Sequence, residues 1–250
     1  MTAPVRRRVA IVAGGSRGIG AQICRRLAAD GFDLVVGFDQ DAAAADGLVG
    51  EIAGAGAGAA LAVRGDIAEP GDVDKLFAEA EQAYGGVDVV VVCAGAHALR
   101  RGPIAETDDA SFHHVVDVNL RGTFNMLRAA STRMRSGGRI ITFSSSAAAL
   151  GVPGQAVYNA CKVAVEALTR QLAKELAGQD ITVNAVAPGP TGTELFLQGR
   201  SPEAVATLAR QVPLGRIGNP GDIAEVVAFL LGAQGGWVNG QVIHANGGIV

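Results

Sequence analysis

Short apolar runs alternate with longer amphipathic segments along this chain. The run Val9-Ala10-Ile11-Val12-Ala13 is apolar at every position, which is typical of a strand buried on both faces of a parallel sheet. Between such runs, apolar residues recur every three or four positions, as on one face of a helix. The pattern predicts strands at about 8–13, 33–38, 59–64, 87–92, 138–143, 180–186 and 241–244, and helices at about 18–30, 41–53, 70–84, 108–134, 157–177, 202–211 and 220–232.

This alternation predicts an α/β fold, a doubly wound seven-stranded parallel sheet of the Rossmann type with helices on both faces. The chain has 250 residues and 49% hydrophobic side chains, so one domain over residues 1–250 can bury a substantial core. The connection at about 190–216 is longer than usual and carries a short helix of its own. Connections of this kind are often lids over a substrate.

Composition and charge narrow the function classes. The formal net charge is −3 and basic residues form no dense patch, so we expect no nucleic-acid partner. The apolar run behind Arg6-Arg7-Arg8 is short and no apolar stretch of about 20 residues occurs, so neither a secretory leader nor a membrane span is expected. No zinc-type Cys/His spacing is present, so no metal is expected. The three cysteines lie scattered on apolar segments, which indicates reduced thiols in a cytoplasmic protein: Cys24, Cys93 and Cys161.

A glycine-rich turn follows the first predicted strand. Gly14 permits a tight turn, and Gly18 and Gly20 let the next helix begin close to a ligand. Free backbone N–H groups and the positive end of the helix dipole at such a point attract a phosphate. Because the turn lies between a strand and an amphipathic helix, it predicts a nucleotide phosphate site made by Gly14, Ser16, Arg17, Gly18, Ile19 and Gly20.

Tyr158 and Lys162 lie four residues apart, so on a helix both side chains project from one face. An ammonium group about 4 Å from a phenol supplies roughly the 4 kcal/mol that lowers the phenol pKa from about 10 to about 7. The pair can therefore act as an acid or base. On spacing alone, an aromatic ring packed beside a solvated lysine is the more common arrangement, and other motifs must decide.

Those motifs are ordered along nearly the whole chain. A serine, Ser145, precedes Tyr158 by thirteen residues, and Asn119 lies in Asp117-Val118-Asn119-Leu120. Together with the glycine turn and the Tyr-x-x-x-Lys pair, they resemble the short-chain dehydrogenases/reductases, in particular the 3-oxoacyl-acyl-carrier-protein reductase-like members. Further agreement comes from Gly65-Asp66-Ile67, Ala94-Gly95, Asn184 to Gly189, Trp237 to Gln241 and Asn246-Gly247-Gly248.

The resemblance implies an oxidoreductase that transfers hydride between a nicotinamide cofactor and a ketone or secondary alcohol. In that family, Ser145 would hydrogen-bond the substrate oxygen and Tyr158 would exchange a proton with it. Lys162 would lower the phenol pKa and hold the nicotinamide ribose, and Asn119 would anchor a water between Lys162 and solvent. The alternative is a catalytically idle dinucleotide-binding sensor or assembly subunit, against which the four intact residues argue.

The resemblance also implies the cofactor contacts. Phe38 stands where users of NAD carry an acid for the ribose hydroxyls, and Arg17 stands where users of NADP carry a cation for the 2′-phosphate. Phe38 and Arg17 thus both favour NADP(H) as the cofactor. Asp39 would repel the 2′-phosphate of NADP(H), so NAD(H) stays as the alternative cofactor. Beyond the glycine turn and the Tyr–Lys pair, the expected cofactor residues are Phe38, Asp39, Asp66, Ile67, Ala94, Gly95, Pro188, Gly189, Thr191 and Thr193.

The expected partners are a small-molecule carbonyl substrate and further copies of the chain. Substrate choice would be set by His97 to Arg101, Ala147 to Gln155 and the lid. Apolar faces in Ser111 to Met134 and Val157 to Ala177 exceed what one sheet face requires, and in the family such faces pair across a two-fold axis, which predicts a homotetramer or at least a dimer.

Two features of the chain depart from the family pattern. Val92-Cys93 replaces two asparagines that commonly brace the sheet near the cofactor. Gln179 and Asp180 replace a basic residue that docks acyl carriers. Arg133 and Arg135 remain as alternative contacts for an acidic carrier, or as solvated charges at a helix end.

Overall fold

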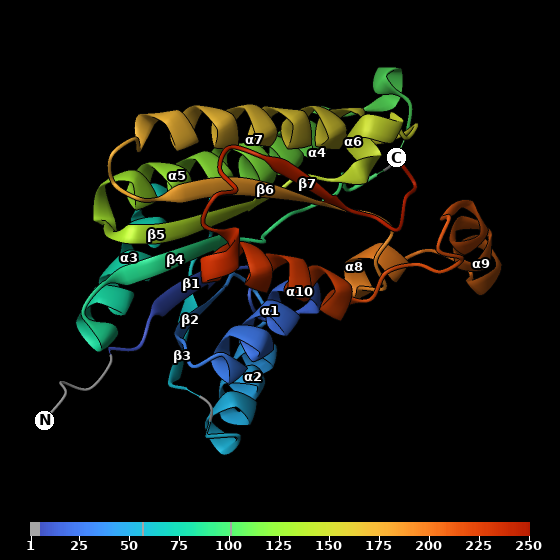
Figure 1. Cartoon of the computed structure of the whole chain (residues 1–250). Helices are drawn as coiled ribbons and strands as arrows, with labels where there is room; N and C mark the ends of the chain where they lie inside the picture. Colours follow the sequence, from blue (N-terminus) through green and yellow to red (C-terminus); the bar gives the residue numbers. More distant parts are fainter. Residues whose placement is uncertain (1–5, 57, 101) are drawn as a thin grey trace, which may run out of the picture.

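The computed structural model describes residues 6–56, 58–100 and 102–250 and contains one parallel sheet (Figure 1). Its strand order is β3-β2-β1-β4-β5-β6-β7, which confirms the predicted doubly wound arrangement. The strands are β1 (Val9–Ala13), β2 (Asp33–Phe38), β3 (Ala60–Arg64), β4 (Val87–Val92), β5 (Met134–Phe143), β6 (Thr182–Pro188) and β7 (Val242–Ala245).

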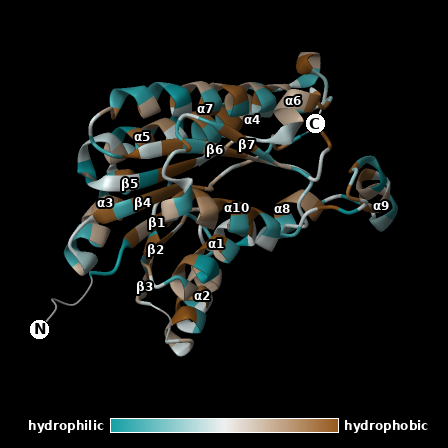
Figure 2. Cartoon of the chain, in the orientation of Figure 1, coloured by the Kyte–Doolittle hydropathy of each residue, from teal (hydrophilic) through white to brown (hydrophobic). Residues whose placement is uncertain are grey.

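Helices cover both faces of this sheet (Figure 1). One layer holds α1 (Gly18–Ala29), α2 (Ala42–Gly54) and α10 (Pro220–Leu231), and the other holds α3 (Pro70–Tyr84), α5 (Gly122–Arg133) and α7 (Ala156–Glu175). Neighbouring residues of a strand pack against opposite helix layers. Ala10 and Val12 of β1 pack against the layer of α1, α2 and α10, and Val9 and Ile11 pack against the layer of α3, α5 and α7. Side chains alternate along a strand, so a central strand needs apolar residues throughout. Figure 2 shows the resulting hydrophobic band along the sheet.

The predicted helix at 108–134 is interrupted in the structure. It consists of α4 (Asp109–Val116), one π-helical turn, η2 (Asp117–Arg121), and α5. A π turn adds a residue to one turn of helix and often marks a functional site. Asn119 lies in this turn. The apolar period that predicted one helix is too coarse to resolve a single extra residue.

Several other boundaries and short elements differ from prediction. The fifth strand begins at Met134 rather than near 138, with an irregular register against β4 between Val87 and Val89. Very short helices lack a periodic signal, and they are α6 (Ser146–Leu150), α8 (Glu194–Leu197), η1 (Ile104–Glu106) and η3 (Ala233–Gly235).

The carboxyl ends of the strands meet at one edge of the sheet. Strand β1 pairs with β2 on one side and β4 on the other, so successive connections leave in opposite directions there and open a crevice. The segment at 190–216 starts from this edge; α8 lies close to the end of α10, and α9 (Pro202–Gln211) projects beyond the body of the molecule (Figure 1). In the part of the chain described, no helix combines the length and apolarity needed to span a bilayer.

Candidate active site

A cleft of about 1290 Å³ lies along the carboxyl edge of the sheet. Its walls come from the glycine turn, the end of β2, the loops after β3 and β4, and the start of the 190–216 segment. The cleft brings together most of the predicted cofactor residues, namely Gly14, Ser16, Arg17, Gly18, Ile19, Gly20, Phe38, Asp39, Asp66, Ile67, Ala94, Gly95 and Thr193.

The glycine turn leaves room that side chains would fill. Gly14 has a φ of +75°, and a Cβ there would lie 2.6 Å from the backbone N of Ala94. A Cβ on Gly20 would lie 2.0 Å from the carbonyl oxygen of Gly14. Helix α1 starts here with no side-chain cap and no acidic residue in its first turn, so its first N–H groups face the cleft uncompensated. This cradle fits the phosphates of a dinucleotide.

Arg17 reaches across the mouth of the cleft. Its Nη1 lies 3.6 Å from Asp41 Oδ2 and 3.5 Å from Glu194 Oε2. Asp39, which was expected from the sequence to repel the 2′-phosphate of NADP(H), lines the same cleft. Its backbone carbonyl oxygen accepts a hydrogen bond from Arg64 Nε at 2.8 Å. Among the described residues, the acids paired with Arg17 are therefore Asp41, which caps α2, and Glu194, which begins α8.

Tyr158 and Lys162 lie on one face of α7, as predicted. Lys162 Nζ lies 5.4 Å from the centroid of the Tyr158 ring and donates a hydrogen bond to the carbonyl oxygen of Phe143 at 3.0 Å. The lysine is only 4% exposed, and this burial lowers its pKa to about 8. Its ammonium group is thus held close to the phenol and poised to titrate not far above neutrality.

Three consecutive serines follow β5, and their hydrogen bonds distinguish them. Ser144 Oγ donates to Glu166 Oε1 at 2.7 Å, and Ser146 Oγ donates to the carbonyl oxygen of Ala187 at 3.3 Å. Ser145 caps α6, where its Oγ accepts from the backbone N of Ala147 at 3.2 Å. No described residue accepts a hydrogen bond from Ser145, so its hydroxyl proton is available to a ligand.

Asn119 joins the loop after β4 to the π turn. Its Nδ2 donates to the carbonyl oxygens of Ala96 at 2.8 Å and Val115 at 2.9 Å, and its Oδ1 accepts from the backbone N of Ala96 at 3.4 Å. The side chain is fully buried. These bonds fix the loop that carries Gly95; whether Asn119 also anchors a water near Lys162 stays a prediction.

Backbone bonds brace the loop where the family commonly has asparagines. The backbone N atoms of Cys93 and Ala94 both donate to the carbonyl oxygen of Ala13 at 2.9 Å. Burial raises the pKa of Cys93 to about 12, so the thiol stays protonated at neutral pH. Strand β1 thereby holds the loop without the missing amide.

The residues after β6 divide into two groups. Thr193 caps α8 and packs against Gly18, where an added Cβ would lie 3.2 Å from Thr193 Cγ2. Thr191 is buried and its Oγ1 donates to the carbonyl oxygen of Gly189 at 2.9 Å, so it serves its own turn. Pro188, Gly189 and Thr191 lie beside the cleft rather than in its lining.

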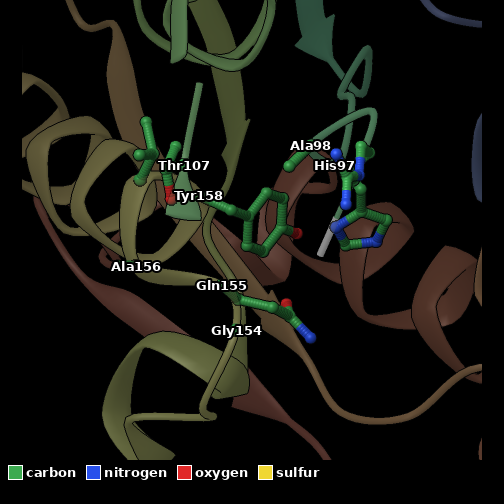
Figure 3. Close-up of a pocket in the computed structure, with 9 residues that line it drawn as sticks. His97, Ala98, Thr107, Gly154, Gln155, Ala156 and Tyr158 are labelled. Carbon is green, nitrogen blue, oxygen red and sulfur yellow. The ribbon is translucent and has the colours of Figure 1, made fainter. Parts of the chain in front are cut away.

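Two residues that position parts of the site, Asn125 and His97, could not be given a role from the sequence. Asn125 of α5 donates through Nδ2 to the carbonyl oxygens of Ile67 and Ala68, both at 3.0 Å, and so positions the loop of Asp66. His97 stacks on Tyr158 with ring centroids 4.6 Å apart (Figure 3). His97 lies in the segment expected to set substrate choice; Arg101 of that segment is outside the described residues.

Comparisons with known proteins agree with this site. A family model described as "Enoyl-(Acyl carrier protein) reductase" matches residues 13–250. A short-chain type dehydrogenase/reductase of Picea abies is 41% identical over 250 residues, which cover 97% of this chain and 92% of that protein. An NADPH-dependent aldehyde reductase-like protein, chloroplastic, of Arabidopsis thaliana is 41% identical over 259 residues, covering 99% and 96%.

Structural similarity is equally extensive. The crystal structure of a blue fluorescent protein from a metagenomic library in complex with NADPH superimposes with a TM-score of 0.91 at 36% identity, over 99% of this chain and 100% of that one. The shared sheet order, the glycine cradle at the switch point and the full-length matches lead to one conclusion. The chain belongs to the short-chain dehydrogenases/reductases, a family of oxidoreductases.

Proposed function

We propose that this protein is an NADP(H)-dependent carbonyl reductase that interconverts a ketone or aldehyde and its alcohol, with Tyr158 as the general acid and base. The observation that carries the proposal is the position of Lys162, whose buried ammonium lies 5.4 Å from the centroid of the Tyr158 ring and donates to the carbonyl oxygen of Phe143, two residues before Ser145. Relatives named as NADPH-dependent aldehyde reductases support it.

Each of these residues has a distinct task in the reaction. A bound nicotinamide supplies the hydride that adds to the carbonyl carbon. Ser145 donates a hydrogen bond to the carbonyl oxygen, and Tyr158 gives that oxygen its proton. The Lys162 ammonium stabilises the phenolate that remains, because opposite charges attract strongly in a buried site. In alcohol oxidation the same proton returns to Tyr158.

The residues that line the cleft support the following cofactor contacts. The turn from Gly14 to Gly20 would hold the diphosphate, Asp66 and Ile67 would lie at the adenine, and Thr193 would reach the nicotinamide end. Phe38 offers no oxygen for ribose hydroxyls, whereas Arg17 is a cation at the mouth of the cleft, so NADP(H) is favoured over NAD(H). We further propose that residues 190–216 close over the bound pair as a lid of the same single domain.

Replacement of Tyr158 by phenylalanine tests this function. Tyr158→Phe keeps the ring and removes the proton donor, so turnover should fall by at least about 100-fold while NADPH still binds, measured by nicotinamide absorbance and by fluorescence titration. Tyr84→Phe removes the chain's other phenol, on α3, and is the matched control. Near-normal turnover in Tyr158→Phe would refute the assignment. NADPH binding without any turnover in the wild type would favour the idle sensor.

We also propose that the protein is a homo-oligomer. Apolar side chains stand in solvent on the outer faces of α4, α5 and α7, where Phe112, Phe124 and Val163 are 45%, 45% and 50% exposed. A patch of this kind is typical of a surface that pairs with another copy. The neighbouring cations Arg133 and Arg135 are held by Glu81 and Asp88, which makes them poor contacts for an acidic carrier protein.

A further inference from the structure

A small pocket adjoins Tyr158 at the substrate end of the cleft (Figure 3). Its volume is about 10 Å³, which is room for one water-sized polar group. His97 and Ala98 line both the pocket and the cleft, so the two lie side by side. In Figure 3 the phenol hydroxyl points toward the side where His97 and the Gln155 amide lie. The full lining is His97, Ala98, Arg100, Thr107, Gly154, Gln155, Ala156, Val157 and Tyr158.

Donor groups line this pocket, and none of its side chains is acidic. Gln155 precedes α7 but its side chain forms no cap bond, and within the described chain its amide has no hydrogen-bond partner. Arg100 likewise forms no hydrogen bond or ion pair with any described residue. By contrast, Arg25, Arg133 and Arg216 each hold a carboxylate through two hydrogen bonds.

Two carboxylates near the cleft, those of Asp108 and Glu194, have other partners. Asp108 interacts electrostatically with Arg100, but its Oδ1 accepts the backbone N of Ser111 at 2.7 Å and caps α4. Glu194 pairs with Arg17 at the other side of the cleft. Among the described residues no carboxylate lies within ion-pair distance of Arg100, so its guanidinium is available to a ligand.

We propose that this pocket receives one oxygen of the substrate's carboxylate, so that the protein reduces short oxo acids, with Arg100 and Gln155 as specificity-determining residues. The inference rests on the proposed carbonyl reductase function. Because the pocket includes Tyr158 itself, the carboxylate lies one or two carbons from the carbonyl group. Arg100 offers a planar pair of N–H donors to a carboxylate, and the Gln155 amide adds a third donor.

The reaction leaves the carboxylate unchanged. Hydride from the bound nicotinamide adds to the carbonyl carbon, a proton from Tyr158 reaches its oxygen, and the oxo acid becomes a hydroxy acid. The carboxylate only sets which carbonyl compound reaches Tyr158 in the right orientation.

A matched pair of substrates tests the inference. Acetoacetate and methyl acetoacetate share the reacting ketone and differ in the charge of the acid group. We expect the wild type to favour acetoacetate in kcat/KM, and the acid-to-ester ratio to fall about 10-fold or more in Arg100→Gln, chiefly through KM for the acid. Gln155→Glu should lower the ratio as well, by repulsion. The ratio should also fall with added salt, because Arg100 is exposed.

The control is Arg25→Gln, which removes an exposed arginine on α1 outside the pocket and the cleft and should leave the ratio unchanged. A wild type that reduces the ester as well as the acid, or an Arg100→Gln variant in which both substrates lose equally, overturns the inference and leaves the carbonyl reductase function standing. If neither substrate nor a simple aldehyde is reduced with NADPH or NADH, the proposed function itself fails.

Discussion

We expect the buried charge of Lys162 to lower the free energy of unfolding. Replacing Lys162 by an uncharged residue should show by how much. Burial lowers its pKa from 10.5 to about 8. At about 1.36 kcal/mol per pKa unit, keeping this group charged below pH 8 costs roughly 3 kcal/mol relative to the unfolded chain. Lys162→Met removes the charge while keeping a side chain of similar length.

One interaction acts in the opposite direction. The hydrogen bond from Nζ to the carbonyl oxygen of Phe143, at 3.0 Å, is lost in the variant. Leaving that buried acceptor without a donor costs about 1–2 kcal/mol. We therefore expect Lys162→Met to raise the free energy of unfolding by about 1–2 kcal/mol near neutral pH and to abolish turnover.

The pH dependence gives the sharper test. Below pH 8 the lysine is charged in both states, and the folded wild type bears the full cost. Between pH 8 and 10.5 the folded state releases its proton while the unfolded state keeps it, so the wild type gains stability as pH rises. The advantage of the variant should shrink through this window and reverse above it.

Urea unfolding at fixed protein concentration, repeated across this pH range, measures the effect. Lys174→Met, at an exposed lysine on the same helix, is the control and should track the wild type. A Lys162→Met protein that is less stable than wild type at neutral pH, or a difference that does not change between pH 8 and 10.5, would show that the ammonium group is better solvated than its burial indicates.

Three further predictions follow from other contacts. Arg17→Ala should weaken NADPH binding about 10-fold and spare NADH, while Asp41→Asn should tighten NADPH; fluorescence titration decides, and equal effects on both cofactors would contradict the role of Arg17. Asp88→Asn removes bonds to Arg6 and Arg135 and should cost about 2–3 kcal/mol in urea unfolding at neutral pH. Burial opposes ionisation of Asp88, but these bonds lower its pKa, so the cost should shrink in acid; a pH-independent cost would refute this. Phe124→Glu places a charge on the exposed apolar face and should dissociate the oligomer, which light scattering would detect as a lower mass. A wild-type protein with the mass of a monomer would refute the proposed oligomer.

The sequence alone determined the sheet and its nucleotide turn, because both depend on local rules. A strand covered on both faces must be apolar at every position, and Val9 to Ala13 satisfies this without reference to any distant residue. Gly14 and Gly20 were also identified from a local requirement: Gly14 has a positive φ in the turn, and a Cβ on Gly20 would meet the backbone of Gly14 in the same turn. The Tyr158–Lys162 pair needs only helical spacing.

Only the tertiary structure decided which groups meet. Which of three adjacent serines keeps a free hydroxyl depends on Glu166 and Ala187, contributed by a helix and a strand later in the chain. Arg17 pairs with Asp41 and Glu194 rather than with Asp39 because packing sets α2 and α8 around the same mouth.

The same holds for the side chains around Tyr158. His97 comes from the loop after β4, and no spacing in the sequence links the two residues. The π turn that holds Asn119 differs from a plain helix by one residue, which the apolar period cannot resolve. Local propensity and periodicity thus fix where each element runs, whereas contacts between residues far apart in the chain exist only once the layers have packed, and those contacts determine the chemistry of the site.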